Sequence, residues 1–246
     1  MDNKIAAVKM RNITKTFGSV VANDRVWLDI YRGEILALLG ENGSGKTTLM
    51  NMLSGIYYPD EGQIFVDGKE VEIRSPKDAF DLHIGMIHQH FKLVDVFTAA
   101  ENIILGLPGD KGKMDKNAVA KAVREIADRY GFDIDPNQKI YEMSVSQKQT
   151  VEIVKVLYRG ADILILDEPT AVLTPQETDK LFAVLRNMRD DGKAVVIITH
   201  KMHEVEELSD RVAVLRHGQF IGDMRTKDTN AQEMTNMMVG HAAVSY

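Results

Sequence analysis

The sequence predicts an α/β fold built around a parallel β-sheet. Apolar runs at residues 35–39, 163–166 and 195–199 are rich in Leu, Ile and Val. This continuous apolar character is typical of strands covered on both faces, whereas half-exposed strands alternate between apolar and polar residues. Predicted helices at 46–56 and 175–190 follow the first two runs, and a strand followed by a helix is the repeating pattern of a parallel sheet.

A second, antiparallel β portion is predicted near the start of the chain. Residues 1 to about 35 alternate apolar and polar positions with turn residues between them, and 63–69 resemble a strand that enters a turn. The middle of the chain is helical in character, with an amphipathic segment at 117–130 and apolar residues at helical spacing over 151–158. A further strand is expected near residue 212.

A phosphate-binding loop follows the first apolar run. Residues 40–47 read Gly-Glu-Asn-Gly-Ser-Gly-Lys-Thr, a complete G-x-x-x-x-G-K-[ST] motif. Its glycines allow the backbone to wrap around phosphate oxygens, and the start of the next helix directs N–H groups toward negative charge. We expect Lys46 to contact the β and γ phosphates and Thr47 to ligate Mg²⁺. The alternative is a Gly-rich turn that contains Lys-Thr by chance. The predicted nucleotide-binding residues are Gly40, Glu41, Asn42, Gly43, Ser44, Gly45, Lys46, Thr47 and Thr48.

Polar side chains also follow the other two apolar runs. Asp167 and Glu168 come directly after the second run, and His200 comes directly after the third. In an open α/β sheet the C-terminal ends of the strands face the ligand crevice. We expect Asp167 to hold Mg²⁺ through water and Glu168 to act as the base, or to polarise the attacking water. An isolated histidine is more often structural, but its position after a buried strand favours a site role for His200.

These motifs predict one domain over residues 1–246, with a P-loop NTPase (RecA-like) core, an antiparallel β subdomain and an inserted α-helical subdomain. We assign 1–89 and 161–225 to the β subdomain and core, 90–160 to the helical insert, and 226–246 to a C-terminal tail. With 246 residues and 44% hydrophobic content, the chain is large enough to bury such a core.

Composition excludes several classes of function. The chain has no cysteine, which rules out disulfides, thiol catalysis and Cys-based zinc sites. A formal charge of −6 argues against nucleic-acid binding by bulk electrostatics. The sequence shows no run of 18 apolar residues and no charged-then-apolar leader, so we expect neither a membrane span nor a secretory signal. Any role at a membrane is therefore expected to depend on a partner.

Together the motifs resemble the ATP-binding subunits of ABC transporters, and the resemblance covers essentially the whole chain. Phe17 matches the aromatic residue that stacks on adenine in this family; a core aromatic is the alternative. Gln89, within Met86–Phe91, matches the glutamine that contacts Mg²⁺ and the water and links the core to the helical insert. His200 matches the histidine that contacts the γ phosphate.

The family signature, normally Leu-Ser-Gly-Gly-Gln, aligns with Met-Ser-Val-Ser-Gln at 143–147. The resemblance implies that Ser144, Ser146 and Gln147 approach the γ phosphate held by a second domain packed head to tail. Both glycines of the signature are missing. The side chain of Ser146 is expected to crowd the phosphate, or to disfavour a positive φ if one is needed there. We therefore expect the composite site that uses this signature to be weakened or slow.

A second departure lies after Glu168. Residues 171–174 read Ala-Val-Leu-Thr, so Thr174 stands where the family usually has an aspartate. This form resembles the first half of the double-length ATPase subunits of sugar and nucleoside importers, and 237–240 resemble the segment that closes that half. Two interpretations remain open: half of a tandem protein, or a free-standing subunit.

The resemblance implies an ATP- and Mg²⁺-dependent ATPase that powers an importer, for nucleosides or sugars, from the cytoplasmic face of the cell membrane. The implied partners are a second nucleotide-binding domain (tandem half or homodimer), transmembrane permease subunits and an extracytoplasmic substrate-binding protein, with no nucleic acid. Residues 89–98 are expected to dock the permease, and packing within the insert is the alternative. The alternative function is a soluble, non-transport ABC ATPase associated with ribosomes or DNA. A GTPase is disfavoured because no Asn-Lys-x-Asp motif is present.

Overall fold

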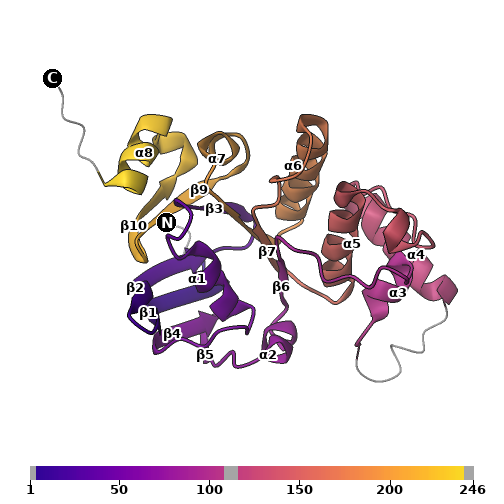
Figure 1. Cartoon of the computed structure of the whole chain (residues 1–246), viewed down its shortest axis with the longest axis horizontal. Helices are drawn as coiled ribbons and strands as arrows, with labels where there is room; N and C mark the ends of the chain where they lie inside the picture. Colours follow the sequence, from indigo (N-terminus) through magenta and orange to yellow (C-terminus); the bar gives the residue numbers. More distant parts are fainter. Residues whose placement is uncertain (1–3, 108–115, 241–246) are drawn as a thin grey trace.

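The computed structural model describes residues 4–107 and 116–240 (Figure 1). Residues 108–115 of the predicted insert, residues 241–246 of the predicted tail and residues 1–3 lie outside the described part of the chain. Within it, no helix has the length and apolar character needed to cross a membrane.

The predicted antiparallel portion is confirmed as a four-stranded sheet with the order β2-β1-β4-β5. Its strands are β1 (Val8–Phe17), β2 (Val20–Ile30), β4 (Glu61–Val66) and β5 (Lys69–Val71). All neighbouring strands pair antiparallel. Asp67 and Gly68 both have positive φ, of 50° and 82°, which suits the tight turn of a two-residue hairpin between β4 and β5.

The second sheet has six strands in the order β10-β9-β3-β8-β7-β6. Its strands are β3 (Glu34–Leu39), β6 (Ile84–Ile87), β7 (Ile163–Asp167), β8 (Ala194–Thr199), β9 (Arg211–Arg216) and β10 (Gln219–Arg225). All pairs are parallel except β9 with β10. The three apolar runs and the strand near 212 are thus confirmed as strands. The short β6 and the half-exposed edge strand β10 lack a continuous apolar run, which explains why the sequence did not single them out.

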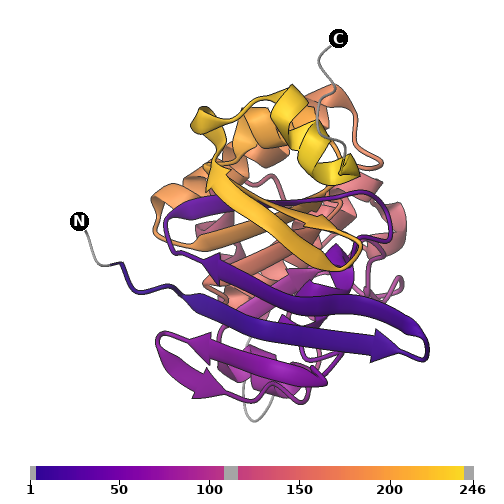
Figure 2. The same cartoon turned by 90° about the vertical axis from the view of Figure 1, so that its left-hand side faces the viewer.

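The six-stranded sheet is covered on both faces. Leu36 and Leu38 of β3 pack into the core beneath the antiparallel sheet, and Ile35 and Leu39 pack into the core on the opposite face. The first core includes α1 (Lys46–Leu53), and the second includes α6 (Pro175–Asp190), α7 (Met202–Leu208) and α8 (Ala231–Val239). Figure 2 shows the antiparallel sheet and the helices α7 and α8 on opposite sides of the second sheet.

A group of helices lies beside the free edge of β6 (Figure 1). It contains α3 (Ala99–Ile104), α4 (Lys116–Tyr130) and α5 (Val145–Tyr158), which share a small core with residues such as Ile103, Val123 and Val151. The short helix α2 (Pro76–Asp81) precedes β6, and 3₁₀ turns occur at Ile140–Glu142 and Thr226–Asp228.

One helix prediction needs correction. The helix predicted at 46–56 ends at Leu53, because Gly55 adopts a left-handed φ of 83° and the chain turns there. A Cβ at Gly55 would lie 2.1 Å from the Ser75 carbonyl oxygen, so only glycine fits. The segment predicted as a tail contains α8, whose Met234 is fully buried against the helices of the second core.

Candidate nucleotide-binding site

The predicted site residues that follow the apolar strands converge at the C-terminal ends of the strands of the six-stranded sheet. The strands β3, β8, β7 and β6 are consecutive neighbours and parallel, so their C-terminal ends lie side by side. The phosphate loop follows β3, His200 follows β8, Asp167 ends β7 with Glu168 next to it, and Gln89 lies two residues after β6. Residues that are far apart in sequence therefore lie together at the C-terminal ends of these strands.

The phosphate loop is held in place by β2. Gly43 and Gly45 have positive φ of 82° and 97°, and a Cβ at Gly45 would lie 2.4 Å from the Ala22 carbonyl oxygen. The fully buried Asn23 donates a hydrogen bond from Nδ2 to the Gly45 carbonyl oxygen at 3.1 Å. This close approach requires glycine and fixes the loop against the antiparallel sheet.

The loop and the start of α1 suit a phosphate group. Lys46 is 5% exposed, and its Nζ donates to the Gly40 carbonyl oxygen and, at 3.2 Å, to that of Glu41. Burial lowers the pKa of Lys46, and the nearby carboxylates of Glu168, Asp167 and Glu41 oppose that shift. No side chain caps α1 and its first turn has no acidic residue, so its terminal N–H groups are available to an anion. A desolvated ammonium group also favours an anionic ligand.

Thr47 and Asp167 provide oxygen atoms of the kind that Mg²⁺ prefers. Thr47 Oγ1 lies 3.2 and 3.3 Å from the two carboxylate oxygens of Asp167. Burial raises the pKa of Asp167, with a further increase from Glu168, while Thr47, Lys46 and His90 act in the opposite direction. Because Mg²⁺ usually retains waters and phosphate oxygens as ligands, two protein groups suffice for a fit.

Gln89, the third predicted Mg²⁺ ligand, follows the neighbouring strand β6. It is exposed and lies in a bend after β6. In the described ranges no hydrogen bond joins it to Thr47 or Asp167. His90, its neighbour, is instead close enough to lower the pKa of Asp167.

Glu168 and His200 form a direct pair. His200 Nδ1 lies 2.9 Å from Glu168 Oε1, and the two side chains are 43% and 13% exposed, respectively. Glu168 has a φ of 46°, which is unusual for a residue with a side chain, and its N–H donates to the Ile198 carbonyl oxygen at 2.9 Å. A strained backbone held against β8 often marks a functional position.

A buried carboxylate joins the two strand ends that carry this pair. Glu204 on α7 is 2% exposed and accepts hydrogen bonds from Thr170 Oγ1 and, at 3.0 Å, from Thr199 Oγ1. Thr170 lies two residues after Glu168, and Thr199 immediately precedes His200. Glu204 therefore ties the segment after β7 to the end of β8.

The predicted signature residues lie at the start of α5. Ser144 caps this helix: its Oγ accepts from Gln147 N–H at 3.2 Å, and Gln147 Oε1 accepts from Ser144 N–H at 2.9 Å. Ser146 lies in the first helical turn and does not have a positive φ, so the backbone objection to serine does not apply here. Figure 1 shows α5 across β7 and β6 from α1. The signature is therefore separate from the phosphate loop of its own chain.

Phe17 lies at the end of β1 and is 41% exposed, which excludes the core-aromatic alternative. Its ring meets the ring of Tyr57 edge to face with centroids 5.1 Å apart, and Lys15 Nζ lies 5.4 Å from its centroid. An exposed ring supported in this way is available for stacking.

Comparison with known proteins identifies the family. Residues 23–171 match the model of the family described as "ABC transporter". The chain belongs to the ABC transporter family. It is 50% identical over 236 residues to the nucleoside import ATP-binding protein NupA of Lactococcus lactis, covering 96% of this chain and 47% of that protein.

Two further ABC proteins show the same likeness. The chain is 52% identical over 234 residues to the guanosine import ATP-binding protein NupO of Bacillus subtilis, covering 95% of this chain and 46% of NupO. It thus spans about half the length of these curated relatives. The dimeric structure of MJ0796, a bacterial ABC transporter cassette, matches with a TM-score of 0.77 and 27% identity, covering 89% of this chain and 98% of that cassette. These comparisons confirm the predicted fold class.

Three residues of this ABC cassette were not predicted from sequence: Asn23, His90 and Glu204. Glu204 could have been predicted from the sequence pattern, because it lies beside Val205 and four residues before Leu208, on the apolar face of α7. A carboxylate on such a face needs hydrogen-bond partners. No sequence pattern indicates a site role for Asn23 or His90, since their contacts depend on how the strands are placed.

Proposed function

We propose that this chain binds and hydrolyses ATP and, paired with a second nucleotide-binding domain, powers an importer of nucleosides or sugars. The observation that carries the proposal is the juxtaposition of the phosphate loop, Asp167 and the Glu168–His200 pair at adjacent strand ends. The names of the relatives NupA and NupO favour transport over a soluble ABC ATPase acting on ribosomes or DNA.

The chemistry relies on positioning and charge. Lys46 offsets negative charge on the β and γ phosphates, and Glu168 orients the attacking water and accepts its proton. His200 holds the Glu168 carboxylate and is within reach of the γ phosphate. Phe17 stacks on the adenine. When bound at Thr47 and Asp167, with Gln89 completing the site, Mg²⁺ supplies additional neutralisation of phosphate charge.

The remaining phosphate-loop residues, Gly40 to Thr48, bind the nucleotide through the loop backbone. Ser144, Ser146 and Gln147 serve a second domain rather than this chain's own nucleotide, and the dimeric MJ0796 cassette supports such pairing. We also propose the domain division into residues 1–89 with 161–225, the insert 90–160 and the tail 226–246.

Permease subunits dock on the helical insert, and an extracytoplasmic binding protein delivers the substrate. The chain then lies at the inner face of the cell membrane. No nucleic-acid partner is expected at a formal charge of −6.

Two substitutions test the assignment. Lys46→Ala is expected to abolish tight ATP binding, because it removes the ammonium group that we propose to contact the β and γ phosphates. Glu168→Gln is expected to retain ATP binding and to lower kcat at least about a hundredfold, since general-base catalysis contributes that much. Equilibrium binding and steady-state ATPase assays measure both effects.

Lys69→Ala and Glu61→Gln, at exposed positions of the antiparallel sheet, provide matched controls. Unchanged hydrolysis by the Glu168→Gln protein would remove Glu168 as the base.

A further inference from the structure

Two exposed aromatic rings lie beside each other at the end of β1. Phe17 is 41% exposed and Tyr57 is 36% exposed, and their rings meet edge to face with centroids 5.1 Å apart. Tyr57 belongs to the segment 54–60 between α1 and β4, which we call the α1–β4 connection. Aromatic pairs prefer particular relative orientations, so Tyr57 restricts the orientation of the ring assigned above to adenine stacking.

The end of β1 that carries Phe17 is an irregular part of the sheet. The pairing of β1 with β4 runs as far as Thr14, which lies opposite Glu61. A register shift between Lys15 and Thr16 interrupts the pairing of β1 with β2. Such a shift disrupts the ladder of hydrogen bonds locally. The position of Phe17 therefore depends on contacts besides the strand pairing.

Asp60 of the α1–β4 connection supplies such contacts. One oxygen of its carboxylate accepts hydrogen bonds from the Thr16 N–H at 2.7 Å and from the Thr16 hydroxyl at 3.0 Å. The other oxygen lies 3.4 Å from Lys15 Nζ, and the Asp60 N–H donates to the Thr14 carbonyl oxygen at 2.8 Å. The hydrogen bonds from Thr16 are the main cause of the lowered pKa of Asp60, so they favour the charged carboxylate. Asp60 therefore fixes the backbone directly before Phe17.

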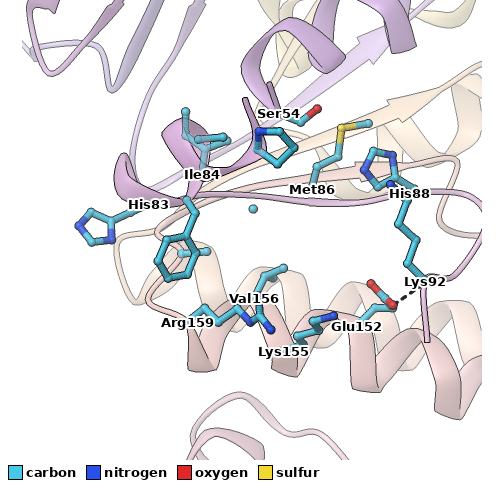
Figure 3. Close-up of a pocket in the computed structure, with 15 residues that line it drawn as sticks. Ser54, His83, Ile84, Met86, His88, Lys92, Glu152, Lys155, Val156 and Arg159 are labelled. Carbon is cyan, nitrogen blue, oxygen red and sulfur yellow. Dashed lines mark hydrogen bonds between the residues drawn. The ribbon is translucent and has the colours of Figure 1, made fainter. Parts of the chain in front are cut away.

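The α1–β4 connection is itself held at the end of α1. The Asn51 carbonyl oxygen accepts hydrogen bonds from the N–H groups of Ile56 at 3.0 Å and of Tyr57 at 3.1 Å. Ser54, the first residue of the connection, lines the same pocket as Met86 of β6 (Figure 3). The connection therefore begins beside the six-stranded sheet, in a turn whose backbone is fixed by the helix.

One short helix joins this support to the phosphate loop. The helix α1 has eight residues, begins at Lys46 and ends at Leu53, where the α1–β4 connection follows. Eight helical residues have a length of about 12 Å. The phosphate loop and the groups that hold Phe17 therefore lie at opposite ends of a single element. A ligand that carries both a triphosphate and an aromatic base can use both ends.

We propose that Tyr57 and Asp60 are positioning residues for the adenine ring of ATP: Tyr57 orients the Phe17 ring, and Asp60 fixes the backbone that carries it. The inference rests on the proposed function, in which Phe17 stacks on the adenine, and deepens it by naming the groups that prepare the stacking surface. A ring that is ordered before binding loses less conformational entropy when the base arrives, so this support raises the affinity for the base.

The test compares the binding of ATP with that of inorganic tripolyphosphate, which has phosphates and no base. Both are measured by titration calorimetry with Mg²⁺ present. Tyr57→Ala is expected to weaken ATP binding by about two- to tenfold, the scale of one aromatic pair, and to leave tripolyphosphate binding unchanged. Tyr57→Phe retains the ring and should bind ATP like the unchanged chain. Tyr58→Ala is the matched control, because Tyr58 is 39% exposed but its ring lies against Arg74.

Asp60 is tested in the same way. Asp60→Ala is expected to weaken ATP binding and to leave tripolyphosphate binding unchanged, because it removes the acceptor of both hydrogen bonds from Thr16. Asp60→Asn keeps one acceptor oxygen and should recover part of the loss. Asp81→Ala, which removes an exposed carboxylate paired with Lys77, is the matched control.

A double-mutant cycle shows whether Tyr57 acts through Phe17. Tyr57→Ala should have no further effect on ATP binding in a chain that already carries Phe17→Ala. If Tyr57→Ala unfolds the chain, Tyr57→Leu takes its place in every measurement. Undiminished ATP affinity of the Tyr57 variant, an equal loss in both backgrounds, or a parallel loss of tripolyphosphate binding would overturn the proposal. By contrast, ATP affinity that Phe17→Ala leaves unchanged would count against adenine stacking in the proposed function itself.

Discussion

Glu204 is a buried residue that links the strand ends carrying Glu168 and His200. It is buried and touches neither Glu168 nor His200, but it bonds Thr170 and Thr199 beside them. We regard it as a positioning residue. Its carboxylate accepts hydrogen bonds from the two threonine hydroxyls and lies 3.8 Å from Lys201 Nζ. An amide keeps one acceptor oxygen, so glutamine should replace Glu204 better than alanine.

Glu204→Ala is expected to lower kcat by between about tenfold and a hundredfold, because small displacements of reacting groups have effects of this size. ATP affinity should stay unchanged, since the phosphate loop is on a different strand end. Glu204→Gln should recover part of the loss. Steady-state ATPase assays measure kcat, and nucleotide-binding assays measure the ATP affinity. Glu206→Ala, at an exposed position of the same helix, is the control. A parallel loss of ATP affinity would indicate general unfolding of the site and not positioning.

At the scale of elements, one face of α5 forms hydrogen bonds with two loops, the segment after β7 and the segment after β6. Gln149 and Glu152 are three residues apart and are 6% and 8% exposed. Gln149 Nε2 donates to the Pro169 carbonyl oxygen at 2.6 Å, directly after Glu168, and Glu152 accepts from Lys92 N–H. The helix that carries the signature is therefore bonded to the segments after β7 and after β6.

Gln149→Ala leaves the buried Pro169 carbonyl oxygen without this donor. We expect it to lower the free energy of unfolding by about 1–3 kcal/mol, the usual cost of an unsatisfied buried polar group. Urea denaturation measures the change, and Gln176→Ala at an exposed position of α6 is the matched control. Equal stability of the two variants would show that Gln149 is not needed to hold this segment.

At the scale of the whole molecule, the signature lies apart from the phosphate loop of its own chain, which fits the proposed pairing with a second nucleotide-binding domain. Ser146 and Glu177 of α6 line the same pocket. Hydrogen bonds from Thr174 are the main cause of the lowered pKa of Glu177, and Ser146 adds a smaller contribution. Thr174 N–H donates to Glu177 Oε1 at 3.0 Å. The signature and the start of α6, which Thr174 caps, therefore lie beside each other within one chain.

ATPase activity per chain is expected to rise with protein concentration as pairs form, and Ser146→Gly is expected to raise it further. The glycine removes the side chain that we propose to crowd the phosphate held by the partner. Hydrolysis assays across a range of concentrations, together with the mass in solution, measure both effects. Equal turnover with and without this change at matched dimer content would show that the serine is harmless.

The sequence by itself determined those features whose functional residues are consecutive in the chain. The phosphate loop is eight consecutive residues, and Asp167 and Glu168 directly follow a run of four apolar residues, so both motifs and the strands beneath them could be predicted without knowledge of packing. Family resemblance extended this to Phe17, Gln89 and the signature, whose roles remain predictions.

Only the tertiary structure decided how these pieces meet. The order β3-β8-β7-β6 is not the order of the chain, and it is this order that places Lys46, Asp167, Glu168 and His200 together. The bonds from Asn23 to Gly45, from two threonines to Glu204 and from Lys92 N–H to Glu152 likewise depend on contacts between separate elements. Local propensity does not encode such contacts, because burial of the two cores, and not the neighbours in sequence, fixes which elements lie side by side.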